Sequence, residues 1–315
     1  MSIDEIAQKI YERQKVNFTL YEAEIDKCQN DIKALAIDHT SKESWSEKIE
    51  KIKKDQRHLA FLYTLILLKC FPNERAIILL SSTLAININN YTYAIKVLSA
   101  LKERTTSDHP SFTDILYLLA KSHRNANFFD DAVVYYRLAQ DSYRERGDTL
   151  NESWMIYSIG KMYLNYLQQP SKSIDLLLQA KQKFEGIGTD DKKKDRGISA
   201  CLDELGDVYR QGLKDYNRAI ETYNEAIEFN KNPKHYYPAG LSRNYCHLGT
   251  CYKYLNNLID AEGYLKKGIE ILYSLPGQEK GLGIRLTQLG NIQIESKLYE
   301  LGFKNLTQGQ SYNIL

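Results

Sequence analysis

Two cysteines and a histidine that lie close together form the nearest approach to a metal-binding group in the chain. These residues are Cys246, His247 and Cys251. On a helix, the four-residue step from His247 to Cys251 would place both side chains on one face, whereas Cys246 would point elsewhere. A protein zinc site needs three or four ligands, and no second ligand pair accompanies these residues. The sequence therefore predicts buried structural thiols, with no metal and no cofactor.

Motifs for catalysis are missing from the sequence as well. It contains no phosphate-binding loop, nucleophile elbow, His-Glu-x-x-His motif or paired Cys-x-x-Cys. Acidic residues are scattered, and no two have a spacing that would bring them together for acid–base chemistry. We therefore expect no catalytic residues and a protein that is not an enzyme.

A three-residue pattern with binding chemistry occurs twice. It consists of Tyr, Lys and Asn at four-residue spacing, which forms one ridge along a helix. The two copies are Tyr117, Lys121 and Asn125, and Tyr157, Lys161 and Asn165. Asn can pair with both the N–H and C=O groups of an extended peptide, and Lys can pair with a carboxylate. Two interpretations stay open: a peptide-binding ridge, or ordinary polar residues on an exposed helix face.

The elements that carry these residues are clearest in the stretch from Leu202 to Phe229. Apolar residues recur at helical spacing in both of its halves: Leu202, Leu205 and Val208, and then Ala219, Tyr223 and Ile227. The segment from Gly212 to Asp215 breaks the pattern and supplies a turn. Gly206 stands where a side chain would be trapped between crossing helices. The stretch therefore predicts two short helices packed against each other.

The same pattern recurs along the chain at intervals of roughly forty residues. The small residue of the first helix is Ser81, Ala120, Gly160, Gly206, Gly249 and Gly290 in turn. The small residue that opens the second helix is Ala94, Ala132, Ser173, Ala219, Ala261 and Gly302. Helix pairs are therefore predicted at about 73–105, 111–146, 150–187, 191–230, 233–273 and 277–314.

This repeated pattern resembles the tetratricopeptide repeat over Asn73 to Leu315. The period is longer than the family's usual value of about 34 residues, because the connections between repeats are longer. The longer period is similar to repeats in Rap-type bacterial peptide receptors and in kinesin light chains. The resemblance implies an all-α fold, a right-handed superhelical solenoid of about six helix pairs that follows an N-terminal helical bundle.

Residues 1–72 form the N-terminal helical segment of this prediction, and residues 73–315 form the repeat domain. Ile3 to Ile37 has the pattern of one long helix or of two. The longest apolar run, Leu59 to Leu68, is about half as long as a membrane-spanning helix requires. We therefore expect a buried helix there and no membrane association.

The net charge restricts the class of partner, and the cysteine content indicates the cellular compartment. The formal net charge is +2, so no field of the whole protein favours nucleic acid as a partner. The five cysteines lack framework spacing and predict reduced thiols in a cytoplasmic protein without a signal peptide. The lysine run 192–194, flanked by aspartates, predicts a solvated loop.

The resemblance implies that the first helix of each pair lines a concave groove. The predicted partner-binding residues are Tyr117, Lys121, Arg124, Asn125, Trp154, Tyr157, Lys161, Asn165, Arg210 and Lys253. The order of Lys and Asn does not reproduce the carboxylate clamp of chaperone-tail binders. The predicted function is a non-catalytic scaffold that binds a protein or peptide. The alternative is a peptide-responsive regulatory receptor of the Rap type, or the sensor or adaptor arm of a larger assembly.

The last predicted pair ends at Leu315 without the polar capping helix that solenoids need for solubility. Two outcomes are expected for this uncapped end. Either the chain is part of a longer protein, or a second copy covers the end in a homodimer.

Overall fold

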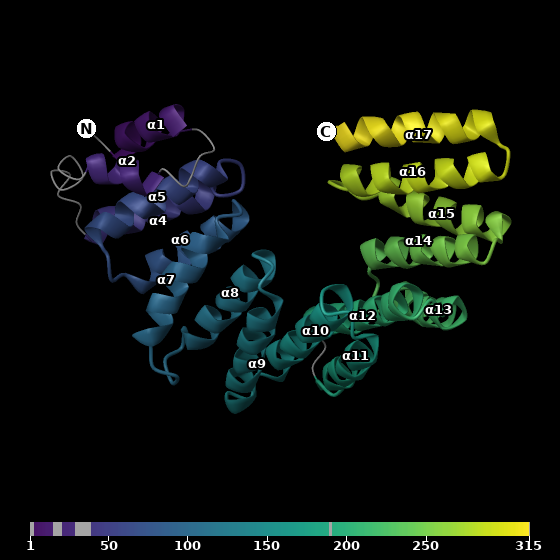
Figure 1. Cartoon of the computed structure of the whole chain (residues 1–315), viewed down its shortest axis with the longest axis horizontal. Helices are drawn as coiled ribbons and strands as arrows, with labels where there is room; N and C mark the ends of the chain where they lie inside the picture. Colours follow the sequence, from purple (N-terminus) through teal and green to yellow (C-terminus); the bar gives the residue numbers. More distant parts are fainter. Residues whose placement is uncertain (1–2, 15–20, 29–38, 189–190, 315) are drawn as a thin grey trace. The chain divides into compact units, whose positions relative to one another are not determined.

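The computed structural model describes residues 3–14, 21–28, 39–188 and 191–314. All regular elements in these ranges are helices (Figure 1). The chain divides into two compact units, Met1–Ser142 and Tyr143–Leu315, which we call the first and second units. Within the described ranges, no helix is both long enough and apolar enough to cross a membrane.

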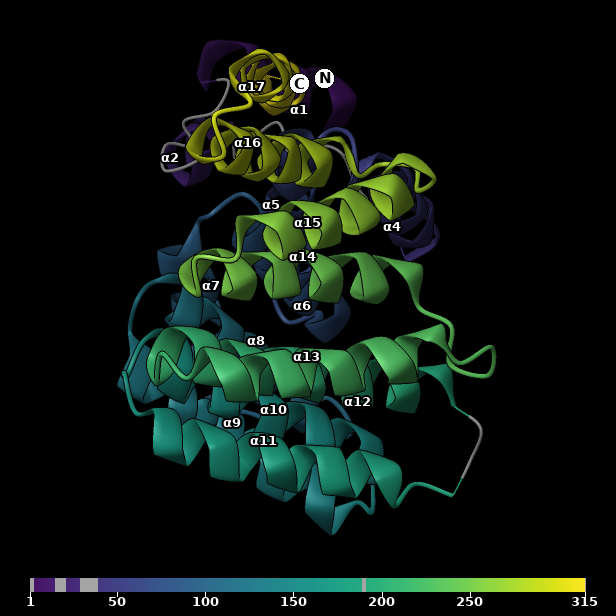
Figure 2. The same cartoon turned by 90° about the vertical axis from the view of Figure 1, so that its right-hand side faces the viewer.

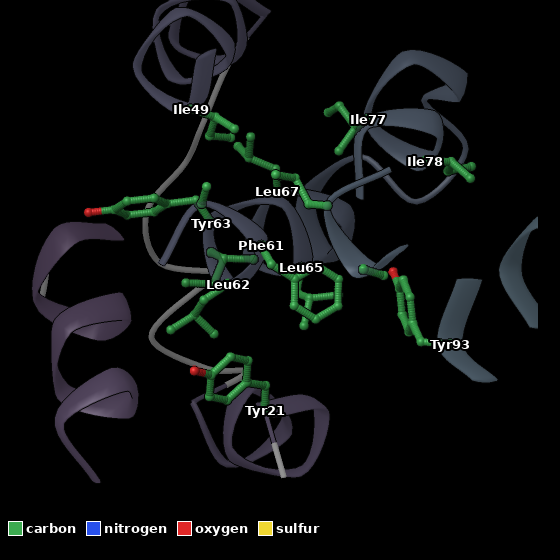
Figure 3. Packing of buried hydrophobic residues seen from close by; sticks show 14 of the residues in the cluster. Tyr21, Ile49, Phe61, Leu62, Tyr63, Leu65, Leu67, Ile77, Ile78 and Tyr93 are labelled. Carbon is green, nitrogen blue, oxygen red and sulfur yellow. The ribbon is translucent and has the colours of Figure 1, made fainter. Parts of the chain in front are cut away.

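The described part of the first unit begins with three helices packed around a fourth, strongly apolar one. The three are α1 (Ile3–Gln14), α2 (Tyr21–Lys27) and α4 (His39–Ile52), and the apolar helix is α5 (Arg57–Cys70). Every residue of α5 from Leu59 to Leu67 is buried, because α5 packs against α1, α2, α4 and the following helix α6. Figure 3 shows part of this core, with Phe61 and Leu62 of α5 close to Tyr21 of α2. The prediction of a buried helix at Leu59 to Leu68 is confirmed. Part of the predicted Ile3–Ile37 segment lies outside the described residues.

Six helix pairs follow, and each lies within or close to its predicted span. In the first unit they are α6 (Arg75–Asn87) with α7 (Tyr91–Glu103), and α8 (Phe112–Asn125) with α9 (Phe129–Glu145), which reaches into the second unit. The second unit contains α10 (Thr149–Asn165) with α11 (Pro170–Glu185), α12 (Lys192–Asp207) with α13 (Tyr216–Lys231), α14 (Pro238–Tyr254) with α15 (Leu258–Tyr273), and α16 (Glu279–Glu295) with α17 (Tyr299–Ile314). A π-helical turn, η2 (Val208–Gly212), extends α12. Figure 2 shows α14 to α17 as successive layers in chain order. The all-α fold with six helix pairs is confirmed.

Small residues at the helix crossings have the role that their spacing predicts. A Cβ atom added to Gly206 would lie 2.3 Å from the ring of Tyr223 on α13. One added to Gly290 would lie 2.8 Å from the carbonyl oxygen of Gly302 on α17. The helices therefore approach too closely for side chains at these positions.

The turn inside each pair shares a feature that the sequence pattern did not predict. In the turn that follows the first helix of each pair, one residue adopts a left-handed backbone conformation with a positive φ. These residues are Asn89, Asn127, Gln168, Lys214, Asn256 and Lys297, with φ between 52° and 64°. Asn tolerates this conformation better than most residues, which accounts for three of the six.

The lysine run at 192–194 was predicted as a solvated loop, and this prediction is wrong. These residues form the first turn of α12. Asp191 precedes the helix, and its carboxylate accepts a hydrogen bond from the backbone N–H of Lys193 at 2.7 Å. The capping carboxylate stabilises this start, because it satisfies a free N–H group and its negative charge interacts favourably with the helix dipole. The predicted domain boundary after residue 72 stays a prediction.

Candidate functional site

A pocket of about 400 Å³ lies on the first helices of three successive pairs in the second unit. Its walls come from α10, from α12 and from the start of α14. The lining residues are Trp154, Tyr157, Lys161, Lys193, Arg196, Ala200, Asp203, Glu204, Tyr237 and Arg243. We call it the α12 pocket, because α12 supplies half of these residues. Its size falls within the range of pockets that bind small molecules or parts of peptides.

One wall of the α12 pocket is aromatic and held rigidly. The ring of Trp154 packs edge-on against Tyr157, with ring centroids 5.4 Å apart, and against Phe184 of α11 at 5.1 Å. Burial raises the pKa of the Tyr157 hydroxyl well above its ordinary value, so the phenol stays neutral. The wall offers a flat apolar surface, and its side chains lose little conformational freedom when a ligand binds.

Glu204 links α12 to the preceding pair. Its carboxylate lies 2.9 Å from the Lys161 ammonium and accepts a hydrogen bond of 3.2 Å from the Asn165 side chain. The Glu204 side chain is buried, so both partners are needed to offset the loss of hydration. Lys161 and Asn165 of the predicted binding ridge therefore hold a carboxylate of the neighbouring repeat.

Asp203 links α12 to the following pair in the same way. One carboxylate oxygen lies 2.8 Å from Nε of Arg243 in an ion pair, and the other accepts a 2.8 Å hydrogen bond from Asn244. Asn230 of α13 donates in turn to Asn244 at 2.9 Å. Burial raises the pKa of Asp203 to about 7, against the opposing effect of Arg243. The two acids of the pocket are thus bound by groups of the protein itself.

The cations Lys193 and Arg196 differ from the other charged residues of the pocket. Among the described residues, no carboxylate forms an ion pair with either of them. The Arg196 guanidinium lies 5.8 Å from the ring of Tyr237, a cation–π arrangement that leaves its N–H donors available. The available charge of the pocket is positive and lies beside flat apolar surface.

A second buried network lies deeper, where η2 meets α13 and α14. Asp207 accepts a 2.7 Å hydrogen bond from the Tyr223 hydroxyl and forms an ion pair with Arg210. Arg210 also donates to the Tyr223 oxygen at 3.2 Å. The His247 ring stacks on Tyr223 with centroids 5.1 Å apart. Burial by itself would raise the pKa of Asp207, but His247 and Arg210 keep it below its ordinary value.

Comparison with known proteins places this region in a family. Residues 200–233 match the family model described as tetratricopeptide repeat. This segment, which comprises the second half of α12, η2 and α13, is a tetratricopeptide repeat. No curated protein sequence matches the chain.

Solved structures of tetratricopeptide-type proteins share its fold. The apo form of RapI is 17% identical, with a TM-score of 0.58 over 86% of this chain and 74% of that one. A Rap protein complexed with competence and sporulation factor is 16% identical, with a TM-score of 0.53 and the same coverage. A putative kinesin light chain from Podospora anserina is 15% identical, with a TM-score of 0.51 over 64% of this chain and 95% of that one. These likenesses show a helical repeat fold.

The structure places the predicted site residues in different environments. Trp154, Tyr157 and Lys161 line the α12 pocket. Asn165 is bound to Glu204, Arg210 to Asp207 and Tyr223, and Lys253 forms an ion pair of 2.6 Å with Glu295. In the first unit, Tyr117 is exposed, Arg124 donates to the Asn125 side chain, and Asn125 lines a separate pocket. Lys121 is partly buried on α8. Binding of a partner by any of these residues stays a prediction.

Several residues of the pocket were absent from the predicted site. Lys193 and Arg196 were missed because the lysine run was interpreted as a loop. The spacing of 193, 196, 200, 203 and 207 forms one helical ridge, so extending α12 backwards from Asp203 would have found both cations. Tyr237 precedes α14, and no periodicity in the sequence indicates its position.

The cysteine and histidine group does not form a metal site. In the described part of the chain, no three His, Cys, Asp or Glu residues are arranged to hold a metal ion. Cys246 and Cys251 are buried, and burial raises their thiol pKa values to about 11 and about 12. His247 contacts Tyr223 and lies 3.8 Å from Asp207.

His247 should make the stability of the second unit depend on pH. Burial lowers its pKa from 6.5 to about 3, although Asp207 opposes the shift. Between these values the unfolded chain binds a proton that the folded chain does not, so stability rises with pH up to about 6.5. We expect this rise to be smaller in His247→Gln, measured by urea unfolding between about pH 4 and pH 7. Parallel curves for the two proteins would contradict the assignment.

Proposed function

We propose that this protein is a non-catalytic scaffold that binds an acidic segment of a protein or peptide in the α12 pocket. The proposal rests on which charged groups of the pocket have a partner within the protein. Asp203 and Glu204 are held by protein groups, whereas Lys193 and Arg196 have no carboxylate partner among the described residues. A carboxylate of the partner would supply the missing anion.

The shape of the pocket adds a second requirement for the partner. A guanidinium binds a carboxylate through two parallel hydrogen bonds, which Arg196 is able to provide. An aromatic or aliphatic side chain next to that carboxylate would rest on Trp154 and Tyr157. The expected recognition element is therefore an acidic residue adjacent to an apolar one. The Rap structure complexed with competence and sporulation factor supports a ligand-binding role for this type of fold.

A regulatory receptor is the second candidate, and the links of α12 to its neighbours favour it. Lys161 holds Glu204, and Arg243 holds Asp203, so each cation joins two repeats. A ligand carboxylate that reached Lys161 or Arg243 would compete with these links. Binding would then alter the packing of α10 or α14 against α12, because a ligand favours the state to which it binds better.

Selection from a random peptide library tests the proposed function without knowledge of the natural partner. Peptides selected on the wild type should be enriched in Asp or Glu next to aromatic or aliphatic residues. The variant Lys193→Glu/Arg196→Glu should lose this enrichment, since its two positive charges are reversed. Both positions are exposed and lie near the N-terminus of α12, where negative charge is favoured, so the variant should fold.

Lys280→Glu is the matched control for this selection. Lys280 is exposed in the first turn of α16, so the change reverses an equivalent charge outside the pocket. The control should select the same acidic peptides as the wild type. Equal enrichment on wild type and double variant, or no enrichment of acidic residues on either, would contradict the proposal.

A further inference from the structure

A pocket separate from the α12 pocket lies in the first unit. Its volume is about 680 Å³. Its lining comes from α2, α5, the start of α7 and the turns that follow α6 and α8. The lining residues are Glu22, Phe61, Leu65, Asn89, Asn90, Tyr91, Thr92, Tyr93, Lys96, Asn125, Ala126, Asn127 and Phe128. We call it the amide pocket, because four asparagines contribute to it.

Aromatic and aliphatic side chains form an apolar surface in the amide pocket. Phe61 and Tyr93 pack edge to face with ring centroids 5.1 Å apart, and Figure 3 shows them next to each other. Leu65 of α5 is also buried at this surface. Phe128, which is 55% exposed, adds an accessible ring face. Because Phe61 and Tyr93 are 0% and 7% exposed, they support the pocket from below, and the ring of Phe128 supplies the flat apolar surface for a planar group.

The fold explains part of the asparagine content. Asn89 and Asn127 occupy the left-handed positions of their turns, each with φ of 64°. Asn90 caps α7, and its side-chain oxygen accepts a hydrogen bond from the backbone N–H of Tyr93. The side-chain oxygen of Asn125 accepts from Arg124 at 3.1 and 3.2 Å. These roles depend on the backbone conformation of Asn89 and Asn127 and on the side-chain oxygens of Asn90 and Asn125.

The NH₂ groups of these asparagines are not used in the same way. Because a backbone N–H and a guanidinium can only donate, the accepting atoms of Asn90 and Asn125 must be oxygen. Their NH₂ groups have no acceptor among the described residues. The first turn of α7 adds backbone N–H groups that have no partner within the helix. Hydrogen-bond donors thus dominate the polar lining of the pocket.

The charges of the lining restrict the ligand further. Lys96 is exposed and has no ion-pair partner in the part of the chain that the structure describes, and Glu22 is the acidic residue of the lining. Glu22 lies on α2, whereas Lys96 lies on α7 and Asn90 directly before it, so a single negative charge placed beside α7 is balanced by Lys96 and the amide donors. A dianion such as phosphate would need further cations to offset its loss of hydration. The lining therefore matches a monoanion.

We propose that the amide pocket binds a small aromatic carboxylate. Its carboxylate accepts hydrogen bonds from the NH₂ groups of Asn90 and Asn125 and from Lys96, and its ring packs against the exposed face of Phe128. The proposal is independent of the acidic segment assigned to the α12 pocket, because the two pockets lie in different units. If binding to one pocket is disproved, the proposal for the other pocket is not affected.

NMR of the ¹⁵N-labelled full chain during titration with benzoate tests the proposal. The side-chain NH₂ signals of Asn90 and Asn125 should shift in a saturable manner. Benzamide has the same ring without the charge and should bind at least about tenfold more weakly. Absence of shifts in these two signals, or benzamide binding as tightly as benzoate, would overturn the proposal.

Isosteric variants distinguish a loss of ligand binding from a loss of folding. The double variant Asn90→Asp/Asn125→Asp keeps the oxygens that cap α7 and bind Arg124, but it replaces both NH₂ groups by hydrogen-bond acceptors. Its affinity for benzoate should therefore fall by at least about tenfold. Its melting temperature should stay that of the wild type. Asn257→Asp is the matched control, since Asn257 caps α15 as Asn90 caps α7, and it should bind benzoate like the wild type. Benzoate affinity unchanged in the double variant would also overturn the proposal.

Discussion

Replacement of Tyr223 by alanine should lower the free energy of unfolding of the second unit by about 4 kcal/mol. Loss of a fully buried aromatic side chain costs about 3–5 kcal/mol by itself, and Tyr223 is 0% exposed. Its ring fills the space beside Gly206 and stacks on His247. The substitution also removes a hydrogen bond to Asp207 and one from Arg210.

Urea unfolding followed by tryptophan fluorescence in a Trp45→Phe background measures this loss. Of the two tryptophans in the chain, only Trp154 then reports, and it lies in the second unit. Tyr254→Ala is the matched control, because Tyr254 is 59% exposed and stacks on Tyr216. The control should cost less than about 1 kcal/mol. Similar losses in the two variants would show that Tyr223 does not support the packing of α12 on α13.

Asp203→Ala should destabilise the second unit by about 1–3 kcal/mol, the cost of leaving a buried polar group without its hydrogen-bond partner. The change removes the acceptor of the buried Asn244 amide and the partner of the Arg243 guanidinium, whose side chain is 42% exposed. Measurement at about pH 8 is preferred, since the pKa of Asp203 is raised to about 7 and the carboxyl must be ionised.

A double-mutant cycle with Arg243→Ala tests whether the two residues act as a pair. The double variant should be more stable than the sum of the two single losses predicts, because the interaction between Asp203 and Arg243 is then lost only once. Additive losses would contradict a coupled link between α12 and α14. The same cycle on Lys161 and Glu204 would test the link between α12 and α10.

The helix pairs could be predicted from the sequence because their signals are local. Gly206 and Gly290 are glycine for a steric reason that acts wherever two helices cross, and their spacing repeats along the chain. The apolar run of α5 likewise indicates burial before any partner is known. These features depend on residue type and interval, which the sequence shows directly.

The binding pocket could be predicted only in part, because its charges pair across repeats. The ridge containing Lys161 and Asn165 was recognised, but the sequence does not show that Glu204 of another helix binds both. Arg196 faces the same pocket only because α12 starts at Lys192. The sequence also gave no indication of the left-handed residues Gln168 and Lys214, because these residue types carry no signal for that conformation.

The central claim is that the α12 pocket binds an acidic segment through Lys193 and Arg196. The most direct test is a titration followed by Trp154 emission in the Trp45→Phe background. The ligands are an acidic peptide from the library selection and its counterpart with lysine in place of each acid. The parent protein should prefer the acidic peptide by at least about tenfold, and Lys193→Glu/Arg196→Glu should reverse the preference. The same preference in both proteins would contradict the account.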